Sequence, residues 1–157
     1  MKKIFSLFVL LLPLTAYALD VGDIAPDFTT VTLDGKELRY SDFKDKKPVY
    51  IIFWATWCPN CKAELPRVVE LYKKLGNKIE FIGINVGINE RLKNVRLFVK
   101  SNGMDFKNVF DRDGRIIRAF GVVGTPTHIV ISRKGVIRYR DAEMPSDLEK
   151  HIERIFD

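Results

Sequence analysis

Residues 48–61 read PVYIIFWATWCPNC, and this stretch decides the fold. Its first part, Pro48 to Ala55, is a continuous apolar run, which predicts a strand that is buried on both faces. Further along, apolar residues recur at helical spacing from Leu65 to Leu75. The two cysteines, Cys58 and Cys61, are therefore expected where a buried strand passes into a helix.

The position of the cysteines favours thiol chemistry. At a strand-to-helix junction, Cys58 would be the N-cap and Pro59 the first helical residue, where a missing N–H costs nothing. The unpaired amides and the positive end of the helix dipole favour a thiolate at Cys58. Cys61, one turn into the helix, would be less exposed. We therefore expect a two-step exchange, in which Cys58 attacks a substrate disulfide and Cys61 then displaces the substrate.

Cysteine usage supports this interpretation, because the chain has only these two cysteines in 157 residues. A bridge that closes so short a loop removes little entropy from the unfolded chain, so it would be a poor staple. A structural zinc site needs four ligands, and the other candidates, His128 and His151, are not in a pairing typical of such sites. We expect a redox-active disulfide between Cys58 and Cys61, with no other cofactor and no metal.

Strands and helices alternate along the rest of the chain. Further strands are expected at residues 28–33, 37–40, 78–86, 109–110, 128–132 and 136–139. Further helices are expected at residues 92–103 and 115–120, and from residue 146 onward. This order predicts one α/β domain with a mixed sheet that helices cover.

Residues 1–18 have the pattern of a secretory signal peptide. Lys2 and Lys3 precede an apolar run, and Ala16-Tyr17-Ala18 offers a cleavage site. The alternative is an uncleaved membrane anchor, although the run is short for a membrane-spanning helix. Residues 19–157 would then form the domain, in the periplasm or otherwise exported. The formal net charge of +6 comes from dispersed basic residues, so nucleic-acid binding is not expected.

Together these features resemble the thioredoxin-fold proteins, and most closely the exported TlpA/ResA-like thiol–disulfide oxidoreductases of the AhpC/TSA–redoxin superfamily. The matching strings are VGDIAPDF at 21–28, FWATWCPNC at 53–61, KAELP at 62–66, DRDG at 111–114 and GTPT at 124–127. The resemblance implies a thioredoxin-like three-layer α/β/α sandwich with a mixed sheet and an amino-terminal β-hairpin. It also implies a central helical insertion between about Asn85 and Gly103.

The resemblance assigns roles to the site residues. It makes Cys58 the attacking cysteine and Cys61 the resolving one. Pro126 directly precedes a predicted strand, where the residues alone favour an ordinary trans proline, whereas the resemblance implies a cis-proline beside the disulfide. The backbone of Thr125 would pair with an extended substrate segment. The residues expected to bind substrate are Trp57, Pro59, Asn60, Thr125 and Pro126.

Glu64 is a further candidate for the catalytic site. Thioredoxin carries a buried aspartate that takes part in proton transfer, and the matching position here is Ile52. Glu64 lies one turn after Cys61 on the same helix face and matches an acidic residue of ResA-like members. It is either a proton relay that tunes the thiols or an ordinary helix-surface glutamate. For His128, a satisfied position on a strand is expected.

The predicted function is the reduction of disulfides in protein clients, for example in cytochrome c maturation. The Pro59-Asn60 pair lacks the histidine of oxidant-type motifs, which favours a reductant, and a reductant in an oxidising compartment needs electrons. The resemblance therefore implies a transmembrane thiol reductase of the DsbD type as donor. The membrane itself would be a partner only if the signal segment stays uncleaved.

Two other functions stay open. A thiol peroxidase of the peroxiredoxin type shares the opening string, but Ile51 stands where such enzymes place a proline, and Thr56 lies one residue too close to the cysteine. A copper-delivery protein of the Sco type pairs a C-x-x-x-C motif with a downstream histidine. Here two residues separate the cysteines, and His128 is not in the usual place for that histidine.

Overall fold

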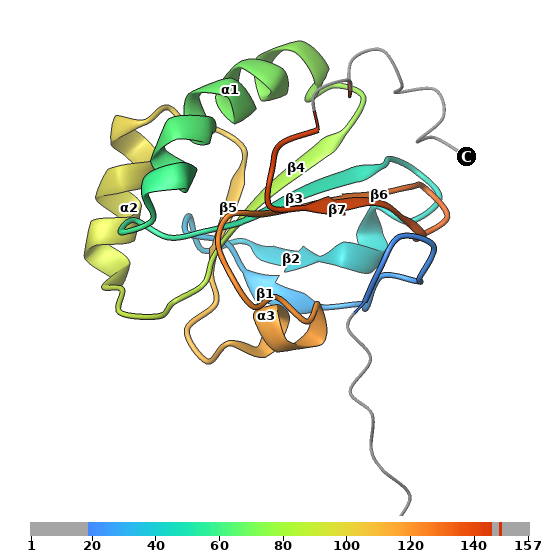
Figure 1. Ribbon diagram of the computed structural model, residues 1–157, viewed down its shortest axis with the longest axis horizontal. Helices are drawn as coiled ribbons and strands as arrows, with labels where there is room; N and C mark the ends of the chain where they lie inside the picture. Colours follow the sequence, from blue (N-terminus) through green and yellow to red (C-terminus); the bar gives the residue numbers. More distant parts are fainter. Residues whose placement is uncertain (1–18, 146–147, 149–157) are drawn as a thin grey trace, which may run out of the picture.

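The computed structural model describes residues 19–145 and Leu148 (Figure 1). The predicted signal segment, and the predicted last helix apart from Leu148, lie outside these residues. The described chain forms a mixed sheet with the strand order β5-β4-β3-β6-β7, in which β3, β4 and β5 are parallel and β6 runs antiparallel to both of its neighbours, β3 and β7. The strands are β3 (Val49–Trp54), β4 (Glu80–Asn85), β5 (Lys107–Phe110), β6 (Thr127–Ile131) and β7 (Ile137–Asp141).

Other elements cover both faces of this sheet (Figure 1). They are the hairpin strands β1 (Thr29–Val31) and β2 (Glu37–Arg39), the short 3-10 helix η1 (Tyr40–Asp42), and the helices α1 (Pro59–Leu75), α2 (Leu92–Ser101) and α3 (Arg115–Ala119). Helices α1 and α2 lie on one face, and α3 and the hairpin lie on the other. The expected three-layer sandwich is confirmed, as are the amino-terminal hairpin and the helical insertion, which is α2 between β4 and β5.

Strand β3 forms the centre of the core, and all six of its residues are buried. Its side chains alternate between the two layers, because successive residues of a strand face opposite sides. Trp54 stacks on Phe98 of α2 with ring centroids 5.3 Å apart, whereas Phe53 contacts Phe120, next to α3, at 5.6 Å. Each large apolar side chain buried in this way contributes about 1.5–3 kcal/mol. The strand therefore fixes the point from which the cysteine motif leaves the sheet.

The segment before and within the hairpin reaches both edges of the sheet. Ile24 forms an isolated bridge with Val136, next to β7. Thr32 forms another bridge with Val109 of β5, at the opposite edge. Backbone hydrogen bonds support both ends: the N–H of Gly22 donates to the carbonyl of Ile137 at 2.8 Å. One short stretch of chain thus contacts both outermost strands.

The predicted strands and helices within the described residues are all present, with bounds that differ by a few residues at most. Helix α1 begins at Pro59, directly after Cys58, as the junction predicted. Within the described part of the chain, no helix is both long enough and apolar enough to cross a membrane.

Candidate active site

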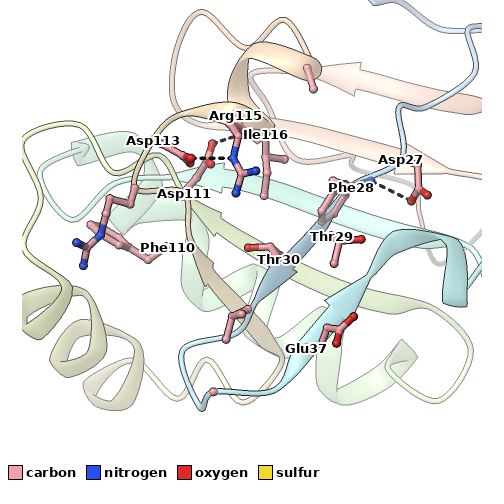
Figure 2. A pocket seen from close by; sticks show the side chains of 14 residues that line it. Asp27, Phe28, Thr29, Thr30, Glu37, Phe110, Asp111, Asp113, Arg115 and Ile116 are labelled. Carbon is pink, nitrogen blue, oxygen red and sulfur yellow. Dashed lines mark hydrogen bonds and ion pairs between the residues drawn. The ribbon is translucent and has the colours of Figure 1, made fainter.

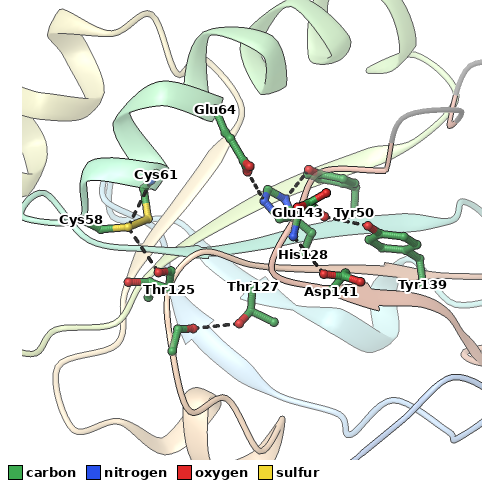
Figure 3. Close-up of polar contacts among 11 residues, drawn as sticks. Tyr50, Cys58, Cys61, Glu64, Thr125, Thr127, His128, Tyr139, Asp141 and Glu143 are labelled. Carbon is green, nitrogen blue, oxygen red and sulfur yellow. Dashed lines mark hydrogen bonds and ion pairs between the residues drawn. A yellow bond between two sulfur atoms is a disulfide. The ribbon is translucent and has the colours of Figure 1, made fainter.

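Cys58 and Cys61 form a disulfide at the start of α1, with their Cα atoms 5.3 Å apart (Figure 3). Cys58 is the N-cap, with extended backbone, and Pro59 is the first helical residue. The backbone N–H of Cys61 donates to the Sγ atom of Cys58 at 3.1 Å. Because this amide lies at the positive end of the helix dipole, it would stabilise a thiolate on Cys58 once the bridge is reduced.

Both cysteines are buried, Cys58 with 2% and Cys61 with none of its surface exposed. The surrounding rim is open, since Pro59 and Asn60 are exposed and Trp57 exposes 48% of its surface. The exposed residues next to the disulfide therefore belong to the motif itself.

On one side of the disulfide lies the loop that precedes β6. The peptide bond between Thr125 and Pro126 is cis, which confirms the expectation from the resemblance. The carbonyl oxygen of Thr125 lies 3.4 Å from the Sγ atom of Cys58. Val123 is fully exposed, and residues 123–127 line one wall of a hollow of about 580 Å³ that the start of the described chain and the end of β7 complete. This side offers a backbone acceptor beside the sulfur and a hollow along the loop that carries it.

On the other side lies the loop between β4 and α2, and Glu90 organises it. Its Oε1 atom accepts hydrogen bonds from the Thr56 N–H at 2.5 Å and from the Asn85 side-chain amide at 3.0 Å. Its Oε2 atom accepts from the Thr56 hydroxyl at 2.8 Å. The indole N–H of Trp57 donates to the carbonyl of Ile88 at 2.7 Å. Sequence reasoning gave Glu90 no role, because an acidic residue in a polar loop carries no local signal.

Glu64 reaches toward the sheet rather than away from it (Figure 3). Its Oε2 atom is 2.7 Å from Nε2 of His128, and Nδ1 of His128 is 2.6 Å from the hydroxyl of Tyr50. His128 is fully buried with both ring nitrogens bonded, so the expected satisfied histidine is confirmed. The contact contradicts the alternative of a free surface glutamate at position 64, while a role in proton transfer stays a prediction.

The protonation states of this chain follow from burial. Burial lowers the pKa of His128, and the hydrogen bond that His128 makes to Glu64 opposes that shift only in part. Burial also raises the pKa of Tyr50 well above its ordinary value. The imidazole is therefore neutral at neutral pH, with one donor and one acceptor nitrogen, and the phenol keeps its proton. Because a carboxylate only accepts, Nε2–H donates to Glu64 and the Tyr50 hydroxyl donates to Nδ1.

Another hollow, of about 840 Å³, is lined by neither cysteine and lies between β1 and the start of α3 (Figure 2). Asp111 at its wall has a structural role: its Oδ2 atom accepts from the backbone N–H groups of Ile116 and Ile117 at 3.0 and 2.9 Å. This contact caps α3 and accounts for the DRDG string. None of the expected site residues lines this hollow.

Candidate ligands for a metal ion do not gather at one site in the described part of the chain. The described residues contain no group of three or more His, Cys, Asp or Glu side chains that could hold a metal ion. Both nitrogens of His128 are engaged by protein groups, so this residue is not the free histidine that a copper site would use.

A mixed sheet, a disulfide at the start of the helix that follows its central strand, and a cis-proline beside the sulfur define a class of protein. That class is the thioredoxin-like thiol–disulfide oxidoreductases, and the protein is an enzyme of this class. The family described as the AhpC/TSA family matches residues 21–140, and the chain belongs to it.

Individual relatives support the class. The chain is 36% identical over 143 residues to the thiol-disulfide oxidoreductase ResA of Geobacillus thermodenitrificans, which covers 88% of this chain and 79% of the relative. A thiol:disulfide interchange protein of the thioredoxin family from Chlorobium tepidum superposes with a TM-score of 0.72 at 27% identity, over 89% of this chain and all of that one. A secreted disulfide oxidoreductase of Mycobacterium tuberculosis, homologous to Escherichia coli DsbE, superposes with a TM-score of 0.66 at 27% identity, over 76% and 89% of the two chains.

Proposed function

We propose that the protein reduces disulfides in protein clients outside the cytoplasm, by dithiol–disulfide exchange at Cys58 and Cys61, with no cofactor besides this pair. The observation that supports it most is the placement of the Cys58 sulfur. This sulfur accepts a hydrogen bond from the backbone N–H of Cys61 at 3.1 Å and lies 3.4 Å from the carbonyl oxygen of Thr125. The helix end would favour the thiolate, and the open rim would admit a substrate.

In the forward reaction, the Cys58 thiolate attacks one sulfur of the client disulfide. The client S–S bond breaks, a mixed disulfide forms, and the other client sulfur leaves as a thiolate. Cys61 then loses its proton and attacks Cys58, so the second client sulfur leaves and the internal disulfide forms. Two electrons pass from the enzyme dithiol to the client. Regeneration needs an external dithiol, for which we propose a transmembrane thiol reductase of the DsbD type.

The client would bind as an extended segment beside Pro126. A hollow of about 580 Å³ lies next to this residue, and both Thr125 and Pro126 line it. The Thr125 backbone would supply sequence-independent hydrogen bonds. Trp57 and Val123, both exposed, would add apolar contact at the two sides of the sulfur. Such recognition suits a reductase that acts on unfolded or partly folded clients, as apocytochromes would be in cytochrome c maturation.

Export is the second part of the proposal. Its support is the signal-peptide pattern of residues 1–18 and the similarity to a secreted oxidoreductase of Mycobacterium tuberculosis. The reductive direction is supported by the absence of a histidine between the cysteines. A measured reduction potential tests this direction: we expect a reducing value, close to those of thioredoxins, and a value as oxidising as that of DsbA would overturn it.

Trapping tests the roles of the two cysteines. We expect Cys61→Ser to accumulate mixed disulfides with clients through Cys58, because the resolving thiol is missing. The matched control, Cys58→Ser, should trap almost nothing. Non-reducing electrophoresis followed by mass spectrometry of the linked peptides measures both. Equal trapping by Cys58→Ser, with none by Cys61→Ser, would reverse the assignment.

A further inference from the structure

A chain of three polar side chains runs beneath α1, from the interior of the sheet to the helix (Figure 3). Tyr50 comes from β3, His128 from β6 and Glu64 from α1. The oxygen–nitrogen distances along the chain are 2.6 Å and 2.7 Å. Tyr50 and His128 are fully buried, and the Glu64 side chain keeps 20% of its surface exposed. A buried polar chain of this kind is costly unless every member is bonded, and here each one is.

Two members of the chain, Glu64 and His128, lie close in sequence to residues of the active site. Glu64 lies three residues after Cys61, on the same face of α1 and one turn further along. His128 lies two residues after Pro126, on the strand that the cis-proline begins. Across the sheet, His128 pairs with Ile52, the position at which thioredoxin carries its buried aspartate. The polar groups beneath the helix therefore come here from α1 and β6 rather than from β3 alone.

The direction of the hydrogen bonds gives each member a distinct task. The Tyr50 hydroxyl donates to Nδ1 of His128, and this bond fixes the tautomer with the proton on Nε2. Nε2–H then donates to Oε2 of Glu64. This bond draws the carboxylate toward the sheet and restricts its rotamers. Without it, a glutamate on an exposed helix turn would sample solvent.

We propose that His128, with its tautomer fixed by Tyr50, is a positioning residue that holds the Glu64 carboxylate where it accepts the proton of the Cys61 thiol in the resolving step. The inference rests on the proposed function, because it concerns the second half of the same exchange. The proton passes from Cys61 to Glu64 as the Cys61 sulfur bonds to Cys58. The bond between Cys58 and the client breaks, and Glu64 returns its proton to solvent or to the departing client thiolate.

Other charged and titratable groups face this chain, and they set a background that the test must keep constant. Arg67 lies on α1 and acts on the charge of Tyr50. Tyr139 and Asp141 lie on β7, and the Tyr139 hydroxyl donates to the carbonyl of Glu143 at 2.7 Å. Burial raises the pKa of Tyr139, so it stays protonated at neutral pH. Asp141 adds a negative charge near His128. None of these groups is changed in the variants below.

The test measures the resolving step alone. A synthetic peptide is joined to Cys58 as a mixed disulfide, and its release by Cys61 is followed from pH 5 to pH 9 by rapid mixing. We expect Glu64→Gln and His128→Leu each to slow release at pH 7 by roughly tenfold, part of the ~10²–10⁴-fold that a general base supplies. Both should also move the midpoint of the pH profile upward. The double variant should be no slower than either single variant, because both remove the same function.

Two conservative variants keep the test decisive. His128→Gln retains an N–H donor and should restore most of the rate. Tyr50→Phe keeps the ring and removes only the hydroxyl, so the fold is preserved and a smaller upward shift is expected. The rate of Cys58 alkylation in the reduced protein and the melting temperature serve as controls. Both quantities should change little in these two variants.

The inference is overturned if Glu64→Gln shifts the profile while His128→Leu and Tyr50→Phe leave it as in the wild type. It is also overturned if His128→Gln is as slow as His128→Leu. A different result separates it from the proposed function: wild-type protein that fails to reduce client disulfides, yet releases the synthetic peptide with the expected profile, would remove the function and retain the positioning role.

Discussion

The two sides of the disulfide differ in how they are held. On the braced side, formed by Thr56, Trp57, Asn85, Ile88 and Glu90, every contact described above uses a hydrogen bond within the protein. On the open side, formed by residues 123–126, the Thr125 carbonyl oxygen faces the Cys58 sulfur and the side chain of Val123 is fully exposed. The reactive sulfur lies between the two sides.

This difference separates two tasks. The braced side fixes the backbone that enters the motif, so that Cys58 meets the helix amides in one geometry. The open side leaves its hydrogen-bonding and apolar groups free for a partner. The fixed backbone geometry of the braced side thus places no restriction on the shape of a client that contacts the open side. A single disulfide can therefore react with many clients. Two substitutions and a change of pH test this division of tasks.

Glu90→Ala should have the largest effect. It leaves the Thr56 N–H, the Thr56 hydroxyl and the Asn85 amide without their acceptor, and one such charge-assisted contact contributes about 1.5–3 kcal/mol. We expect the free energy of unfolding to fall by about 2–3 kcal/mol, measured by urea denaturation of the oxidised protein. Client reduction should slow as well.

The matched control for Glu90→Ala is Glu90→Gln, which keeps one acceptor oxygen and should lose less than half as much. If Glu90→Ala has the same urea midpoint of unfolding as the wild type, the stability of the braced side does not depend on this carboxylate.

Lowering the pH should have an intermediate effect on the free energy of unfolding, through His128 on β6. His128 has a lowered pKa in the folded protein, so below pH ~6.5 the unfolded chain binds a proton that the native state does not. The stability is complete above that pH and is lost as the pH falls through the folded value. Unfolding at pH 7, 6 and 5 should show this loss in the wild type and a smaller one in His128→Gln. Parallel curves for the two proteins would show that His128 does not contribute.

Val123→Asp should have the smallest effect on stability, within about 0.5 kcal/mol, because the side chain is fully exposed. The substitution should change client binding more than it changes stability. Removing one apolar contact and adding a charge should raise KM for an apolar client peptide several-fold and leave kcat nearly unchanged. Val123→Ala is the control that removes size without adding charge. An unchanged KM for the Asp variant would mean that clients do not use the open side.

The parts of the fold and site that the sequence predicts are those with local signals. The buried strand and the helix that starts at Pro59 each follow from neighbouring residues. The cis bond before Pro126 required the resemblance, since residues alone favour trans. The family's motifs also drew attention to Glu64, which lies on α1 and contacts His128.

The contacts that the sequence does not predict join distant segments. Thr56 and Glu90 are 34 residues apart, Glu64 and His128 are 64 apart, and Tyr50 and His128 are 78 apart. No periodicity links residues at such separations, and each residue type is common on surfaces or in cores. The sequence shows that Ile52 stands where thioredoxin has its aspartate. That His128 lies opposite Ile52 became clear only from the pairing of β6 with β3.

The two isolated bridges of the amino-terminal segment have a consequence for self-association. Outer strands of a sheet present unpaired N–H and C=O groups, which can recruit another chain. Here Thr32 occupies part of the β5 border, and Ile24 occupies the border beside β7. One continuous segment therefore shields both borders against intermolecular strand pairing, and loss of that segment would expose the two at once.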